Sequence, residues 1–120
     1  MAWQFNQPEP VFLQIAQVLR ARIVSGELAP GSLVPTVRQL AADAAVNPNT
    51  VQRAFEQLET QGVLRSERGS GWFVTEDIGC AQALYQAMVE QKCRQFFLEM
   101  ADLGMTPDAV KNLVKEWENE

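Results

Sequence analysis

Apolar residues recur at helical spacing in a stretch that begins at Pro10 and ends at Gly26. The repeat places five apolar side chains on one face and leaves Arg20 and Arg22 outside it. This stripe consists of Phe12, Ile15, Ala16, Leu19 and Ile23. Because proline suits the start of a helix and glycine its end, we predict one amphipathic helix here.

Two further amphipathic stretches follow. Thr36 is placed to cap the first of them, and Gln39, three residues on, completes a capping box. In the second, Asn47 is the expected cap, and Pro48 falls at the first helical position, where its missing N–H removes no hydrogen bond. Gly62 is expected to end this helix in a left-handed conformation. The apolar faces consist of Val37, Leu40 and Ala41 in the first helix, which runs to about residue 45, and of Val51, Ala54, Phe55 and Leu58 in the second.

Two short β runs lie on either side of residues 68–71, where two glycines permit a tight turn. A helix-turn-helix followed by a β-hairpin is the winged-helix arrangement, which places its second helix in a DNA groove. We therefore predict a winged helix-turn-helix domain over residues 8–77, with the helix-turn-helix at about 37–60 and the wing at 63–75.

The last third of the chain contains two more helical patterns. One covers residues 80–103 and should stop at Gly104, and the other begins with Thr106 as cap and Pro107 as first residue. Joined by a turn of about two or three residues, they form an αα-hairpin over residues 80–119. The predicted fold class is therefore mostly α with a small β-hairpin wing: an N-terminal winged helix-turn-helix and a C-terminal two-helix hairpin.

Each helix of this hairpin carries an apolar stripe that a lone hairpin leaves exposed, so a partner surface is needed. We interpret the hairpin as a homodimerisation module, and the alternative is that it folds back on its own winged domain. The predicted dimerisation residues are Leu84, Met88, Val89, Cys93, Phe96, Phe97, Met100, Leu103, Val110, Leu113, Val114 and Trp117. A small effector of unknown identity could still bind between the dimer helices.

The third predicted helix presents a polar face at its N-terminal end. Amides such as Asn49 and Gln52 can pair with adenine through two hydrogen bonds, and Arg53 can reach guanine or phosphate. Thr50 either joins them or packs at the third helical position. The full set of predicted DNA contacts comprises Thr36, Arg38, Asn47, Asn49, Thr50, Gln52, Arg53, Arg68, Ser70 and Gly71.

Charge is divided unevenly along the chain, whose formal net charge is −5. Residues 1–75 hold six arginines and six acids, whereas residues 76–120 hold four basic and nine acidic residues. The acidic second part should therefore face away from phosphate. Two arginines of the first part retain a structural alternative to DNA contact: Arg38 can pair with Glu59 or Asp43, and Arg65 can balance Glu67 across the hairpin.

The residue inventory argues against an enzyme. The chain contains no histidine, which excludes a histidine base, a histidine triad and a histidine-bound metal, and we expect neither a cofactor nor a metal.

Cys80 and Cys93 lie thirteen residues apart on one predicted helix and cannot bridge to each other. They either pack as small apolar residues or act as a redox switch. With neither a signal peptide nor an apolar run of membrane length, a cytoplasmic protein without a membrane partner is expected.

The order of these motifs resembles the DNA-binding domain of the GntR superfamily of bacterial transcriptional regulators. The similarity covers residues 8–76, and residues 47–51 together with the short C-terminal part are most similar to the YtrA-type subfamily. The matching positions are Gln14–Ile15, Ser25–Leu28, Pro30–Gly31, Pro35–Ala41, Val46–Val51, Ala54, Leu58–Glu59, Gly62 and Gly69–Val74. The resemblance implies a cytoplasmic homodimeric repressor that binds operator DNA.

The sequence departs from the family at positions that matter for binding. Many relatives outside the YtrA-type subfamily carry Arg at the positions of Pro48 and Gln52, so these two family contacts are not carried over. Trp72 replaces a usually small residue and either pads the core or lies against a DNA sugar. We interpret the chain as a sequence-specific transcriptional regulator, a repressor that binds a palindromic operator as a homodimer. The alternative is an interaction adaptor that docks another protein through its winged helix, although its polar face lacks aromatic anchors.

Overall fold

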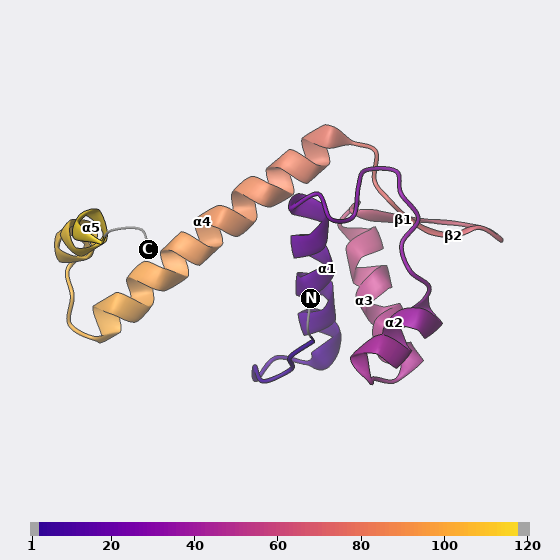
Figure 1. Ribbon diagram of the computed structural model, residues 1–120, viewed down its shortest axis with the longest axis horizontal. Helices are drawn as coiled ribbons and strands as arrows, with labels where there is room; N and C mark the ends of the chain where they lie inside the picture. The colour runs from indigo at the N-terminus through magenta and orange to yellow at the C-terminus, as the bar shows by residue number, and fades with distance from the viewer. Residues whose placement is uncertain (1–2, 118–120) are drawn as a thin grey trace. The chain divides into compact units, whose positions relative to one another are not determined.

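The computed structural model describes residues 3–117, which form five helices and one β-hairpin (Figure 1). In chain order these are α1 (Val11–Val24), α2 (Val37–Ala44), α3 (Pro48–Thr60), β1 (Leu64–Glu67), β2 (Gly71–Val74), α4 (Ile78–Asp102) and α5 (Pro107–Glu116). This mostly helical architecture with one hairpin confirms the predicted fold class. Contacts divide the chain into two compact units, Met1–Leu84 and Tyr85–Glu120. None of the helices within residues 3–117 is long and apolar enough to cross a membrane.

The helices of the first unit begin where their capping residues predict. Thr36 Oγ1 accepts a hydrogen bond from the Gln39 backbone N–H at 3.1 Å, and Gln39 Oε1 accepts one from the Thr36 N–H at 2.8 Å. This is the predicted capping box. Asn47 Oδ1 accepts from the Asn49 N–H at 2.8 Å, and α3 is followed by Gly62 with φ 76°. Both ends of α3 are therefore fixed by local interactions, as expected from the sequence.

The core of the first unit lies where α3 packs against α1, α2 and β1. The predicted stripes supply most of the buried residues: Ile15, Ala16, Leu19, Ile23, Leu40, Ala41, Val51, Ala54, Phe55 and Leu58. Phe12 and Val37 stay half-buried. The half-buried Trp72 packs edge-on against Phe55, with ring centroids 5.3 Å apart. Trp72 thus pads the core, which was one of its two interpretations.

The wing is a two-stranded antiparallel hairpin in which Leu64 pairs with Val74 and Arg65 with Phe73. The segment before α2 runs along the other edge of β2, where the Val74 N–H donates to the Ser32 carbonyl at 2.9 Å. Because side chains alternate along a strand, Leu64 and Val74 point into the core while Arg65 and Phe73 lie on the outer face.

The segment before α1 makes a contact that no periodicity indicated. The Trp3 indole N–H donates to Asp43 Oδ2 at 2.8 Å, and the Arg22 guanidinium carbon lies 4.7 Å from the Trp3 ring centroid. Arg22 Nε is also 3.3 Å from Glu27 Oε2, and its side chain is only 13% exposed. Arg22 lies outside the apolar stripe, as predicted, but Trp3 covers its guanidinium and Glu27 neutralises it, which the sequence did not indicate.

Arg20, also expected outside, is half-buried. Its Nη1 donates a hydrogen bond to Gln61 Oε1 at 2.9 Å, which ties α1 to the end of α3. Burial lowers the pKa of the Arg20 guanidinium, and the charge of Glu9 partly opposes this shift.

The predicted pair of C-terminal helices is present. Gly104 follows α4 with φ 90°, and Thr106 Oγ1 caps α5 by accepting from the Ala109 N–H at 3.2 Å. The connection spans residues 103–106 and is longer than predicted, because α4 ends at Asp102 and Leu103 lies outside it. The first seven residues of α4 belong to the same compact unit as the wing, and Leu84 packs against its core.

Candidate nucleic-acid interface

The N-terminal end of α3 presents a polar surface because four buried apolar side chains fix which face of the helix turns inward. Asn49 and Arg53 are exposed, whereas Thr50 and Gln52 are half-buried. The first backbone N–H groups of a helix and the positive end of its dipole favour an approaching phosphate. At this end of α3 Pro48 has no N–H, the Asn49 N–H is bonded to Asn47 Oδ1 and the Thr50 N–H to the Asn47 carbonyl. The positive end of the dipole and the candidate polar side chains therefore remain for DNA, rather than free backbone N–H groups.

The three candidate readers on α3 differ in what already binds them. Gln52 Nε2 donates to Glu56 Oε2 at 3.3 Å, and the Arg53 guanidinium carbon lies 4.0 Å from the Phe12 ring centroid. Within residues 3–117 no group is hydrogen bonded to the Asn49 side chain. Asn49 can therefore meet a base edge without breaking a contact, whereas Arg53 must leave a cation–π contact with Phe12.

Arg38 on α2 is exposed, and both acids proposed as its alternative partners are engaged elsewhere. Asp43 accepts from Trp3 at 2.8 Å, and Glu59 Oε2 accepts from the Ser66 hydroxyl at 3.1 Å. In the described part of the chain no carboxylate pairs with Arg38. Its guanidinium is therefore available to phosphate.

Thr36 and Asn47 serve as helix caps, as described above. Each uses its side-chain oxygen as an acceptor in the cap, so the Thr36 hydroxyl and the Asn47 amide still have protons to donate. Both side chains are exposed at the N-terminal ends of neighbouring helices. Their geometry thus permits a phosphate contact in addition to the cap.

The tip of the wing is a three-residue turn over residues 68–70. Arg68 and Ser70 are exposed, and their side chains make no polar contact with the rest of residues 3–117. Gly71 has φ 109°, and a Cβ placed there would come within 3.2 Å of Leu33 Cδ1. Glycine at this position lets the turn close over Leu33 and leaves Arg68 as the free cation of the tip.

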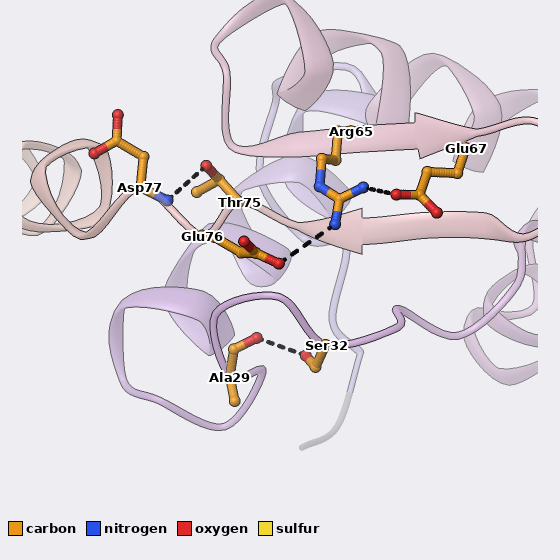
Figure 2. Close-up of polar contacts among 7 residues, drawn as sticks. All are labelled: Ala29, Ser32, Arg65, Glu67, Thr75, Glu76 and Asp77. Atoms are coloured by element: carbon orange, nitrogen blue, oxygen red, sulfur yellow. Dashed lines mark hydrogen bonds and ion pairs between the residues drawn. The ribbon is translucent and has the colours of Figure 1, made fainter.

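Arg65 is held by the protein itself (Figure 2). Its Nη1 forms an ion pair with Glu67, its Nη2 lies 3.6 Å from Glu76 Oε1, and its guanidinium lies 5.0 Å from the Phe73 ring centroid. Arg65 does pair with Glu67, but along β1 and not across the hairpin as expected, because both residues belong to the same strand. Glu76 was not identified from the sequence, because it follows β2 and lies outside the strand alternation.

Most of the predicted dimerisation residues are exposed or half-buried in the second unit. The exposed ones are Val89, Cys93, Phe96, Leu103, Leu113, Val114 and Trp117, and the half-buried ones are Met88, Phe97 and Met100. Two others are covered within the chain itself: Leu84 packs against the winged-domain core, and Val110 is 1% exposed. Val110 therefore has little surface left for a partner, whereas Leu84 is half-buried and keeps part of its surface.

Comparison with known sequences agrees with this geometry. Residues 12–74 match the family described as bacterial regulatory proteins, gntR family. The chain is 34% identical over 112 residues to the HTH-type transcriptional regulator YhcF of Bacillus subtilis (strain 168), and the aligned residues cover 93% of each protein. It is 28% identical over 108 residues to the HTH-type transcriptional repressor YtrA of the same organism, over 89% of this chain and 83% of the repressor.

Solved structures of transcriptional regulators also resemble this chain. A GntR family transcriptional regulator from Listeria monocytogenes has a TM-score of 0.86 and 32% identity, over 95% of this chain and 100% of that chain. The DNA-binding domain of AraR, solved in complex with operator ORX1, has a TM-score of 0.57 and 27% identity, over 62% of this chain and 99% of its own. These relatives regulate transcription, which confirms the expectation of a DNA-binding regulator rather than an enzyme.

Proposed function

The chain belongs to the GntR family of bacterial regulatory proteins, and from this premise we propose that it is a homodimeric repressor that binds a palindromic operator. One observation carries the proposal. Asn49 on α3, Arg38 on α2 and Arg68 on the wing are exposed, and their side chains have no polar partner within the described residues. A winged helix-turn-helix turns these three elements toward DNA, so the three free groups are suited to base and phosphate contacts.

The second unit supports a homodimer. Among its described residues only Val110 is a buried apolar side chain, whereas Phe96 is 41% and Trp117 79% exposed. An apolar surface of this kind needs a cover, and a second copy supplies a matching one across a two-fold axis. Nucleic acid is a poor cover, because residues 76–120 carry five more acidic than basic residues.

A two-fold dimer presents two copies of α3 in opposite orientation. Such a pair is complementary to an inverted repeat whose half-site centres lie about 34 Å apart, one helical turn, or a multiple of it. We therefore propose that one dimer occupies one palindromic operator. Because this ligand is bacterial chromosomal DNA, we place the protein in the cytoplasm.

Repression is the regulatory direction we favour, since the relative YtrA, similar over most of its length, is a transcriptional repressor. A dimer bound at an operator can exclude the transcription machinery by occupancy alone. The alternative of a protein-docking adaptor is not favoured, because the outer face of α3 carries Asn49, Arg53 and Glu56 and no exposed apolar anchor.

Selection of bound duplexes from a random pool by the full-length chain tests this function. We expect an inverted repeat, bound by one dimer, with an affinity that falls steeply as salt rises. Recovery of direct repeats or single unpaired half-sites would contradict the dimer geometry. Binding that does not respond to salt would contradict phosphate contacts, and a pool without enrichment would contradict operator binding.

A further inference from the structure

The outer face of α3 carries an acid among its candidate DNA-binding residues. Asn49, Arg53 and Glu56 are exposed and follow one another at helical spacing, opposite the buried face of the helix. A carboxylate here is unfavourable for nucleic-acid binding, because it repels the phosphates that an arginine attracts. Glu56 therefore lowers the general affinity of this face for DNA, and its contact with a neighbouring residue indicates what it contributes instead.

Glu56 accepts a hydrogen bond from the candidate reader one helical turn before it. Gln52 Nε2 donates to Glu56 Oε2 at 3.3 Å, and Gln52 is half-buried while Glu56 is exposed. We propose that Glu56 is a positioning residue that holds the Gln52 amide in the orientation that reads adenine. The inference rests on the proposed operator binding and adds that each half-site contains an A·T pair read by Gln52.

The donors and acceptors of the two side chains determine the orientation of the amide. A glutamine amide turned end for end exchanges its NH2 group with its oxygen, so an isolated amide can present either end to a base. A carboxylate only accepts hydrogen bonds. In the turned orientation the Gln52 oxygen would face the Glu56 carboxylate, and two acceptors that face each other repel. Glu56 therefore favours the orientation in which the Gln52 NH2 group points toward it.

This orientation leaves the groups that adenine requires. In the major groove adenine presents N7 as an acceptor and its N6 amino group as a donor, and glutamine meets both with one N–H and its oxygen. The Glu56 contact uses one of the two amide protons of Gln52, so the other proton and Oε1 remain. Guanine instead presents two acceptors, which require two donors. Glu56 therefore disfavours guanine, because it leaves Gln52 with one donor.

The exposure of the pair sets the size of the effect. A glutamine–acid pair one turn apart on an exposed helix changes a conformational preference by about 2-fold. Against DNA the same pair loses water, which strengthens its electrostatic interaction. We therefore expect Glu56 to contribute about 2- to 5-fold to the preference for adenine over guanine, out of the roughly 5- to 150-fold that a contact through two hydrogen bonds provides.

Base preference measures this role, because a purely structural change would alter the affinity for all sequences together. The full-length chain is titrated with duplexes that contain one selected half-site and with the single-base variants of that half-site. Gln52→Ala identifies the base pair that this residue reads. Glu56→Ala should reduce the preference for adenine over guanine at the same base pair by about 2- to 5-fold, while the affinity for non-operator DNA rises because one negative charge is lost.

A double variant distinguishes positioning from direct contact. If Glu56 acts through Gln52, Glu56→Ala should change no base preference in the background of Gln52→Ala. The matched control is Glu90→Ala, which removes a pair of the same kind from α4, where Gln86 Nε2 donates to Glu90 Oε1 at 3.2 Å. Because this pair lies outside the reading helix, the control should leave every base preference unchanged.

The inference is overturned if Gln52→Ala relaxes the preference at no A·T pair, or if Glu56→Ala keeps the wild-type preference at that pair. It is also overturned if Glu56→Ala still changes a preference in the background of Gln52→Ala, or if Glu90→Ala relaxes the preference equally. Relaxation by Glu56→Ala at a different base pair would instead show direct contact, such as acceptance from a cytosine amino group. In each of these results the chain still binds its half-site, so the proposed function survives. A wild type that binds no DNA would overturn the proposed function itself.

Discussion

Arg53 on α3 rests on Phe12 of α1, with its guanidinium carbon 4.0 Å from the ring centroid. The contact joins α3, which we expect to bind the DNA bases, to α1, which packs against α3. Arg53 is exposed and Phe12 half-buried, so the arginine covers an apolar ring while its charge stays near solvent. An arginine that the sequence assigned to DNA therefore also stabilises the packing of α1 on α3.

The first prediction measures this contact by a double-mutant cycle. Phe12→Leu, Arg53→Ala and the double variant should give a coupling of about 0.5–1 kcal/mol in the free energy of unfolding, as for cation–π pairs at exposed sites. Chemical denaturation of the four proteins provides the values. Pairing Phe12→Leu with Arg68→Ala is the control, and that pair should be additive. A Phe12–Arg53 coupling no larger than the control would disprove the contact.

The second prediction concerns base reading by Asn49. Since its side chain is exposed and makes no hydrogen bond within residues 3–117, Asn49→Ala should leave the fold intact. It should cost about 1–3 kcal/mol of binding on the selected operator and relax the preference at one base pair. Titration of the selected site and of its single-base variants measures both effects. Equal affinity of Asn49→Ala and the wild type would exclude this residue as a reader.

The third prediction separates the two arginines of the wing. Arg68 is free at the tip, whereas Arg65 is neutralised by Glu67 and Glu76. Arg68→Ala should therefore weaken binding to all sequences and reduce the slope of log affinity against log salt by about 1, and Arg65→Ala should leave this slope nearly unchanged. Binding isotherms at several salt concentrations measure the slope for each variant. The same slope change in both variants would mean that Arg65 leaves its carboxylates to meet phosphate.

The fourth prediction tests the dimerisation surface. Phe96 belongs to the apolar stripe of α4, and Leu98 lies outside that stripe although it is 61% exposed. Phe96→Glu should yield a monomer, because it places a charge in the proposed interface, and Leu98→Glu should stay dimeric. Analytical ultracentrifugation distinguishes the two states. Dissociation by Leu98→Glu alone would place the interface on another face of α4.

The fifth prediction compares two truncations. A chain ending at Leu84 keeps the Cys80 and Leu84 contacts with the first unit, whereas a chain ending at residue 78 loses them. Both should be monomeric and bind one half-site weakly, and the longer fragment should be more stable by about 1 kcal/mol because it half-buries Leu84. Denaturation gives the difference, and sedimentation gives the state. A stable dimer of either fragment would contradict the assignment of dimerisation to the tail.

The elements and the polar face of α3 were predictable from the sequence because they depend on neighbours within one or two helical turns. The capping box of Thr36 and Gln39, the cap at Asn47 and the left-handed Gly62 each involve residues a few positions apart. Apolar periodicity likewise determines which side of each helix is buried, since burial follows the helical repeat. The outward position of Asn49 follows from these local rules alone.

Which side chains the arginines contact was decided by the tertiary structure. Arg53 meets Phe12, Arg20 meets Gln61, and Arg22 meets Trp3. The first two pairs join residues about forty positions apart, and they form only because α1 packs beside α3. The third depends on a segment without periodicity. A long, flexible arginine side chain can reach several partners, and which one it contacts depends on which lies nearest in the folded chain. The sequence therefore determined the helix and face on which each arginine lies, and the packing of the helices determined its partner.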